Sequence, residues 1–207
     1  MPSDLQVSNI KDLTGSNTGL SIASDGQVTI AQNNPTVTLH ATGDSSSTNT
    51  TFPKGFVIQT LGVIKTDTSL MNTTDAIPGL AVDITPKITG SKMLIYCTIC
   101  FGRQNGNSAY PFQIFRDSTQ IARPTSPGSN RQEGFDAGSD ETGDYSTFAT
   151  FHHLDTHGIS AETQISYTIK VNQRTTDATV INRSYNDSDN VYTNRGVSSL
   201  TIMEIAP

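Results

Sequence analysis

The feature that most constrains the fold is the strand-like run Val197–Ile205, which only Ala206 and Pro207 follow. Loose termini usually end in polar residues that are not held by the rest of the protein. A β-type sequence carried to within two residues of the end therefore predicts that the last segment is paired inside a sheet. We expect a β fold that the chain closes with its own tail.

Strand-like segments recur at regular intervals from residue 56 onward. They are Phe56–Ile64, Leu80–Thr85, Met93–Phe101, Phe112–Phe115, Thr147–His152, Ile165–Val171, Thr179–Asn182 and Val197–Ile205. Within them, apolar residues alternate with polar ones, so that Leu80, Val82 and Ile84 share one face. Eight strands predict an all-β antiparallel sandwich or jelly roll over residues 56–207, with little helix.

Residues 1–55 read differently, as short apolar pieces between polar turns. The pieces are Leu5 to Ile10, Leu20–Ile22, Val28–Ile30 and Val37–Leu39, and Asp25-Gly26 predicts a hairpin turn between the second and the third. None of these pieces can bury itself alone, so we expect an extended arm that is stable against other copies or another protein. The polar stretch 41–51 predicts the linker between arm and head.

Composition excludes several classes of function. Only 15% of the 207 residues are charged, the net charge is −6 and the pI is near 5.0, whereas nucleic-acid binding needs clustered Lys and Arg. No apolar run approaches the roughly 20 residues that cross a bilayer, and Met1–Leu5 lacks the features of a signal peptide. We expect no nucleic-acid partner, no membrane insertion, and a product that stays in the compartment where it is made.

Cys97 and Cys100 form a C-x-x-C motif inside an apolar run. At this spacing on a strand, the two side chains point to opposite faces, which is poor geometry for a mutual disulfide or a shared metal. We expect buried free thiols that act as small apolar residues, with redox or metal roles as the alternative.

Two clusters offer metal-ligating side chains. His152, His153 and His157 could bind a transition metal, but the first two face opposite ways on a strand, so three ligands would have to come from several copies around an axis. The loop 133–144 could hold calcium, although it lacks an ordered D-x-D-x-D-G pattern. Its carboxylates are Glu133, Asp136, Asp140, Glu141 and Asp144. We favour solvated residues in both places and expect no metal and no cofactor.

No catalytic signature is present in the sequence. There is no G-x-S-x-G elbow, no Gly-rich phosphate loop between a strand and a helix, and no recognisable setting for paired carboxylates. We therefore expect a protein that is not an enzyme.

Three short motifs after residue 70 resemble tailed-bacteriophage virion structural proteins. They are Asp75–Ile95, the hairpin-like Phe115–Ile121, and the ending Ser198–Ile205. In the first motif, the resemblance implies that Pro-Gly-Leu opens a strand, that Thr-Pro-Lys makes a turn, and that Ser-Lys precedes the central strand. Ser118 stands where the hairpin of those proteins usually has Gly. The resemblance implies a tumour-necrosis-factor-like jelly roll that forms a homotrimer, made in the bacterial cytoplasm and located on the virion surface.

The arm refines this interpretation, because residues 8–15 and 22–30 are similar to N-terminal segments of marine phage fibre-like proteins. Only about 55 residues precede the head, so we favour a capsid-surface decoration (cement) or head-fibre protein over a short tail fibre that binds a host receptor. A carbohydrate-binding module is a third hypothesis, resting on Tyr110, Phe112, Tyr185 and Tyr192 being exposed together, whereas we expect most of these rings to be core or strand-pair residues.

The expected anchor of the arm is its first apolar residues. These are Leu5, Val7, Ile10 and Leu13, which would lie in grooves of the major capsid protein or of another virion protein. Trimeric binding would multiply weak contacts through effective concentration. A host surface glycan or receptor remains a partner of the tail-fibre alternative.

Overall fold

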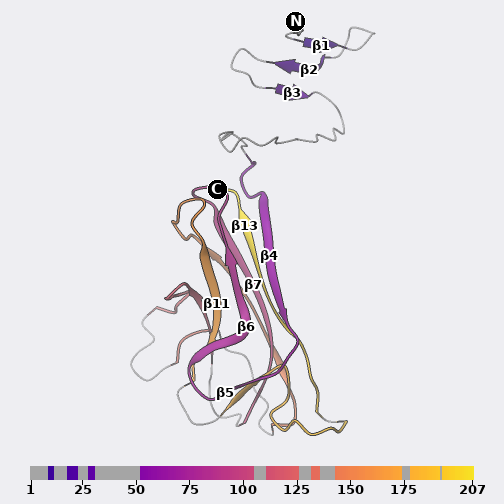
Figure 1. Ribbon diagram of the computed structural model, residues 1–207, viewed down its shortest axis with the longest axis vertical. Coiled ribbons are helices and arrows are strands. Elements are labelled where there is room, and N and C mark those ends of the chain that lie inside the picture. Colours follow the sequence, from indigo (N-terminus) through magenta and orange to yellow (C-terminus); the bar gives the residue numbers. More distant parts are fainter. Residues whose placement is uncertain are drawn as a thin grey trace, which may run out of the picture. The chain divides into compact units, whose positions relative to one another are not determined.

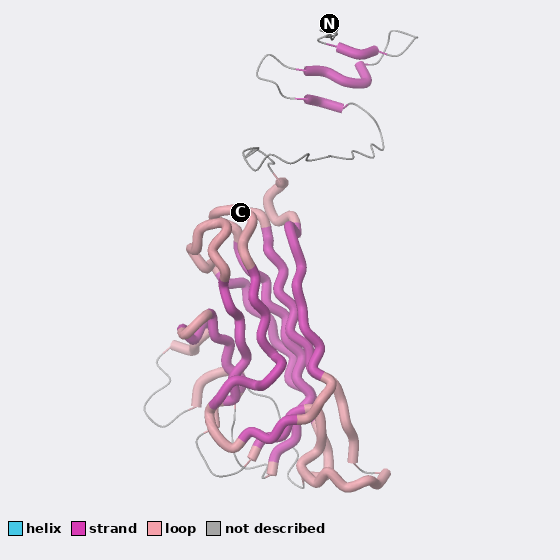
Figure 2. The backbone as a smooth tube through the Cα atoms, viewed as in Figure 1, coloured by secondary structure: helices cyan, strands magenta, loops and turns pink. Residues whose placement is uncertain are grey.

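The computed structural model describes residues 9–11, 18–22, 28–30, 52–104, 111–125, 132–135, 143–173, 178–191 and 193–207. The chain divides into two compact units, residues 1–50 and 51–207. Every helix or strand assigned in the described ranges is a β-strand, which agrees with the expectation of little helix (Figure 1, Figure 2). In these ranges, accordingly, no helix has the length and hydropathy of a membrane span.

The first unit contains a small antiparallel sheet in the order β1-β2-β3. Its strands are β1 (Asn9–Lys11), β2 (Thr18–Ile22) and β3 (Val28–Ile30). Leu20 lies opposite Ile30, so the hairpin pairing predicted around Asp25-Gly26 is confirmed, while the turn itself lies outside the described residues. The expected piece Val37–Leu39 and the expected linker 41–51 also lie outside them.

The second unit, the head, is a sandwich of two antiparallel sheets, which confirms the predicted all-β fold class. Its strands are β4 (Val57–Lys65), β5 (Ser69–Met71), β6 (Asp75–Ile84), β7 (Lys92–Arg103), β8 (Phe112–Arg116), β9 (Thr119–Ile121), β10 (Thr147–Asp155), β11 (Ile165–Val171), β12 (Thr179–Ile181) and β13 (Ser198–Ile205). The six-stranded sheet runs β4-β13-β7-β12-β5, with β10 on the other edge of β7. The four-stranded sheet runs β6-β11-β8-β9.

The C-terminal strand lies where its sequence predicts, inside a sheet. β13 pairs with β4 on one side and with β7 on the other. Leu200 and Ile202 point into the core, and the buried Glu204 carboxylate accepts backbone N–H bonds from Lys87 at 2.9 Å and Ile88 at 3.1 Å. The tail therefore also holds the Thr-Pro-Lys turn between β6 and β7.

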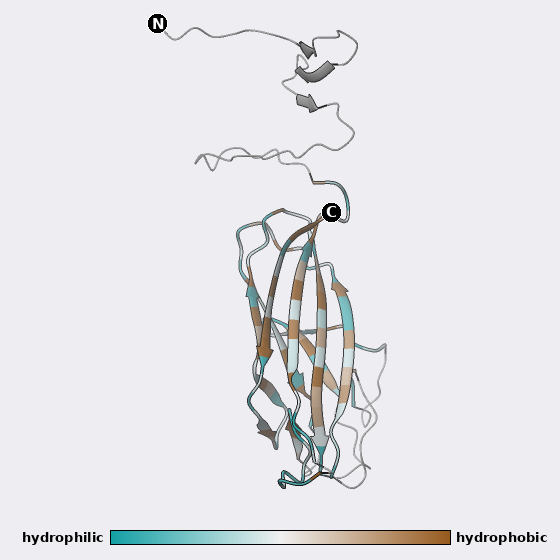
Figure 3. Ribbon diagram, turned by 90° about the vertical axis from the view of Figure 1, so that its right-hand side faces the viewer, coloured by the Kyte–Doolittle hydropathy of each residue, from teal (hydrophilic) through white to brown (hydrophobic). Residues whose placement is uncertain are grey.

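The core fills the space between the two sheets with the inward residues of each strand. In β11, Ile165, Tyr167, Ile169 and Val171 are all fully buried, as their alternation predicts. Hydrophobic and hydrophilic bands alternate in the same way along the strands in Figure 3. Two polar contacts join the sheets at Asp155 on β10, which accepts hydrogen bonds from the Tyr167 hydroxyl on β11 at 2.7 Å and from the Arg116 guanidinium on β8 at 2.8 Å.

Two local departures have clear physical causes. Strand β6 starts at Asp75, before the Pro-Gly-Leu that the resemblance places at its start. Pro78 and Gly79 lie inside the strand, where its pairing with β11 is irregular, so they interrupt the pairing without ending the strand. Gly79 has a φ of +79°, which side chains rarely adopt. In the β8–β9 hairpin the positive φ of +52° falls on Asp117, so Ser118 can replace the usual Gly and the hairpin is confirmed.

Strand β7 is buried on both faces at its C-terminal end. Cys97 belongs to the core, whereas Cys100 lies on the outer face beneath the loop that leaves the sheet at Asn182 and returns at Ser198. Gly196 of that loop comes so close that a Cβ there would lie 2.6 Å from the Cys100 Sγ. Both cysteines are free and buried, as expected.

Candidate functional site

The predicted anchor of the arm cannot be examined directly. Leu5, Val7 and Leu13 lie outside the described residues, and Ile10 lies in β1, where it pairs with Leu20. The anchoring role of these residues stays a prediction.

The three histidines are not brought together. His152 is exposed on the outer face of β10 and stacks on Tyr96 with ring centroids 5.6 Å apart, whereas His153 on the same strand faces the other way and is half-buried. His157 is buried beyond the end of β10, where its Nδ1 accepts the N–H of Ile159 at 3.0 Å. Within the described ranges, no group of three His, Cys, Asp or Glu residues is placed to hold a metal.

The acidic loop is described only at its two ends, because residues 136–142 lie outside the described ranges. Glu133 pairs with Arg123 at 2.8 Å, and Asp144 accepts a hydrogen bond from Asn186 at 2.7 Å. These two carboxylates are thus engaged by neighbouring side chains of the head.

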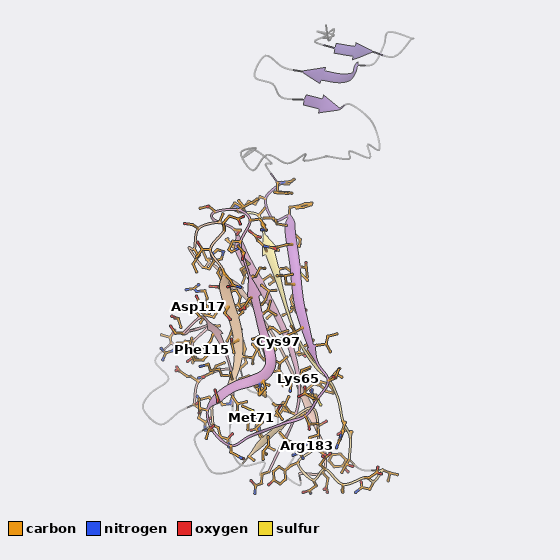
Figure 4. The ribbon with its side chains drawn as sticks, in the orientation of Figure 1. Lys65, Met71, Cys97, Phe115, Asp117 and Arg183 are labelled. Carbon is orange, nitrogen blue, oxygen red and sulfur yellow. The ribbon has the colours of Figure 1, made fainter. Side chains whose placement is uncertain are left out.

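The buried ionisable groups stabilise the fold and give no nucleophile. Burial raises the pKa of the Cys97 thiol, and also that of Cys100 despite its hydrogen bond to Ser146. Burial is likewise the main reason why the pKa of Tyr167 is raised, with its hydrogen bond to Asp155 second. The Cys97 side chain, labelled in Figure 4, is 1% exposed. Thiols with raised pKa are poor nucleophiles.

The structure describes two of the four rings on which the sugar-binding hypothesis rests. Phe112 is fully buried and packs edge-on against Phe101 with centroids 5.0 Å apart, so it is a core residue and not one of the exposed rings that this hypothesis needs. Tyr185 is half-buried, and Tyr110 and Tyr192 lie outside the described residues. Phe112 on β8 is buried because its side chain faces the core, as its register opposite the buried Val171 of β11 requires.

A polar hollow of about 370 Å³ lies in the loop between β12 and β13. It is lined by Asp187, Ser188, Asp189, Asn190, Thr193, Asn194 and Arg195. Arg195 closes one side through a two-pronged contact with Asp187 at 2.8 and 3.1 Å. The side chains and backbone groups that line this hollow largely hydrogen-bond to one another.

The most distinctive surface of the head is the outer face of the six-stranded sheet. The registers of β10, β7, β13 and β4 place three rows of four outward residues side by side. From β10 to β4 the rows are Leu154, Leu94, Met203 and Thr60; His152, Tyr96, Thr201 and Gly62; and Thr150, Thr98, Ser199 and Ile64. Phe148 follows the last row on β10. We call these thirteen residues the uncharged face, because no Asp, Glu, Lys or Arg is among them.

Large apolar side chains on the uncharged face are open to solvent. Ile64 is 72% exposed, Phe148 54%, Leu154 47% and Tyr96 46%. A group of apolar residues on one sheet face is typical of an interaction surface rather than of a solvated one. Between them, the hydroxyls of Thr98 and Thr150 lie 3.2 Å apart and share a hydrogen bond.

Sequence reasoning missed this face, although a signal was present. The apolar run Met93–Phe101 was assigned to a strand, but its residues at outward positions, Leu94 and Tyr96, are not the polar residues that a wet face needs. What the sequence could not supply was the register that sets them beside Leu154 and Met203 on neighbouring strands.

The head thus belongs architecturally to the antiparallel β-sandwiches. No protein-family model matches the chain, and no curated protein matches it. Among solved structures, it is similar to a chain in the structure of infectious bursal disease virus strain Gx, with a TM-score of 0.35 and 12% identity over 82% of this chain and 46% of that one. It is also similar to a chain in the structure of strain Gt, with a TM-score of 0.36 and 11% identity over 92% of this chain and 51% of that one. A third similar chain is in the structure of the T13 viral particle of the same virus, with a TM-score of 0.32 and 10% identity over 81% of this chain and 40% of that one. The chain spans about half or less of those chains, and at these TM-scores the likeness carries no functional argument.

Proposed function

We propose that this protein is a non-enzymatic structural protein of a tailed-phage virion. In this proposal, it is a trimeric capsid-surface decoration or head-fibre protein whose arm, residues 1–55, attaches to the major capsid protein or another virion protein. The β-sandwich head faces outward. The proposal rests on the motifs of the sequence together with one structural observation, the uncharged face.

The uncharged face supports a role in assembly because it exposes Ile64, Tyr96, Phe148 and Leu154 on one side of a sheet, with no charged residue among its thirteen members. A soluble enzyme would need converging reactive groups, and the ionisable groups that are buried in the described part of the head are held by neighbours in structural roles. A structural protein instead needs surfaces that other subunits can cover. The face meets that need without any catalytic residue.

Immunogold labelling of particles of the encoding phage tests this proposal. An antibody against the head should decorate the capsid of intact particles in many copies. Gold confined to the tail tip would instead support the alternative of a short tail fibre that binds a host receptor or glycan. Absence of label from purified particles would contradict both versions.

A further inference from the structure

We infer that the uncharged face is covered by identical copies of this chain, so that the head associates with itself through the outer side of β10, β7, β13 and β4. This inference rests on the proposed function, which includes a trimer, and identifies the surface that would form it. It commits to one occupant, a second copy, against a capsid protein or a host molecule.

The distribution of charge is the first argument. The chain carries a net charge of −6, so copies repel one another unless the surfaces that meet are neutral. In a symmetric oligomer the same patch recurs on every copy, which brings like side chains near the axis. The thirteen residues of the uncharged face avoid this repulsion, and Lys92, the next outward residue of β7 after Leu94, lies at the margin of the face. A foreign partner recognised by its charge would need acidic or basic residues within the face.

The second argument is that part of the polar surface of the face is satisfied within the face. Thr98 and Thr150 share a hydrogen bond, and the His152 ring stacks on Tyr96 at an interplanar angle of 25°. Covering the face would therefore bury the apolar side chains of Phe148 and Leu154 while this pair of hydroxyls stays hydrogen-bonded.

The third argument is the edge strand of the face. β10 pairs with β7 over nine residues in unbroken register and carries no Pro, Lys or Arg that would protect an edge strand. Among the described residues no strand pairs with its other edge, so the apolar residues of β10 continue to an edge on which another copy can pair.

The outer side of the four-stranded sheet lacks these properties. Lys170 lies there with its Nζ 4.2 Å from the centre of the Phe115 ring, and Asp83 is exposed on the neighbouring strand. The segment 132–135 covers part of this sheet, since Gln113 is buried and donates to the Glu133 carbonyl at 3.0 Å. The chain itself completes this side of the sandwich.

A pair of matched substitutions in the full chain tests the inference. Thr201 on β13 and Thr168 on β11 are both half-buried, outward residues of strands inside a sheet, one on each side of the sandwich. Native mass spectrometry and sedimentation equilibrium of wild type, Thr201→Glu and Thr168→Glu compare their masses. We expect an oligomer for wild type and Thr168→Glu, and at least tenfold weaker association for Thr201→Glu.

Three results would overturn the inference: a monomeric wild type at tens of micromolar, an unchanged oligomer in Thr201→Glu, or dissociation by Thr168→Glu. Circular dichroism shows whether each variant is folded; should Thr201→Glu unfold, Leu154→Lys at a more exposed position of the same face replaces it with the same expected result. Because the readout is mass alone, it is independent of whether the protein is found on capsid or tail.

Discussion

The two outer sides of the sandwich follow the same alternation of buried and outward residues, yet the outward residues differ in their chemistry. On the four-stranded sheet, charged residues such as Lys170 and Asp83 face solvent and the segment 132–135 covers a part. On the six-stranded sheet, apolar residues such as Ile64 and Phe148 are left open. The difference teaches that the same alternation of buried and outward residues can leave one outer side charged and the other uncharged and apolar.

The largest expected effect is a difference in the free energy of unfolding between two neighbouring substitutions on β13, one in the core and one on the uncharged face. Ile202 on β13 is fully buried, whereas its neighbour Thr201 points outward. Ile202→Ala should lower the free energy of unfolding by about 3–4 kcal/mol through lost burial and a cavity. Thr201→Ala should lower it by less than about 1 kcal/mol. Urea denaturation of both variants measures this, and equal losses would mean that β13 has no core side.

The next effect concerns the hydrogen bond between Tyr167 and Asp155, which joins the two sheets through the core. Its loss should lower stability without changing either outer side of the sandwich. Tyr167→Phe removes the hydroxyl that donates to Asp155, leaving that buried carboxylate to Arg116 at 2.8 Å. The expected loss is about 2 kcal/mol, since a buried hydrogen bond to a charged group is broken. Thermal unfolding measures the loss, and the oligomeric mass should stay that of wild type. A changed mass would show that this tie also shapes the uncharged face.

A smaller effect is expected in the dependence of stability on concentration. If copies cover the uncharged face, each tenfold rise in protein concentration adds up to about 1.4 kcal/mol of apparent stability per partner bound. Melting temperatures of wild type and Thr168→Glu should therefore rise with concentration, whereas that of Thr201→Glu should not. Parallel rises in all three proteins would place association elsewhere, for example in the arm.

The smallest effect comes from pH and distinguishes a buried histidine from an exposed one. Burial is the main cause that lowers the pKa of His157 from 6.5; Asp155 and Glu204 oppose this lowering and Arg116 reinforces it. The unfolded chain therefore binds a proton that the folded head excludes, so stability is full above about pH 6.5 and falls as the pH drops below it.

The matched variants for this pH effect are His157→Gln and His152→Gln. The first substitution should flatten the acid side of the stability profile because Gln takes up no proton, while the second replaces an exposed histidine of the uncharged face and controls for the loss of a histidine elsewhere on the head. Urea midpoints measured between pH 5 and 8 check both. A slope that survives His157→Gln would assign the effect to another group.

Much of the sandwich could be predicted because its strands are long and alternate clearly. Ile165–Val171 has the bounds that its pattern gave, and the C-terminal strand differs by one residue. By contrast, β5 (Ser69–Met71) is three residues long and exists through its pairing with β12, which no local pattern encodes. Pro78-Gly79 likewise looked like a strand start, because only the pairing with β11 reveals an irregularity inside a longer strand.

The candidate site could be predicted much less well, since it depends on neighbours across strands. His152 was considered as a metal ligand, but its stacking on Tyr96 makes it part of an apolar face. Phe112 was considered as an exposed ring, but its position opposite Val171 turns it into the core. Register, rather than residue type, decides both outcomes.

The most direct test of the central claim is stoichiometric rebinding to particles of the encoding phage that have been stripped of this protein. The full chain should saturate capsids in many copies and should not bind intact host cells, while a variant lacking residues 1–14 should fail to rebind although its head stays folded and oligomeric. Binding to cells with only a few copies per particle, or full rebinding by the shortened variant, would contradict the account of a decoration protein held by its arm.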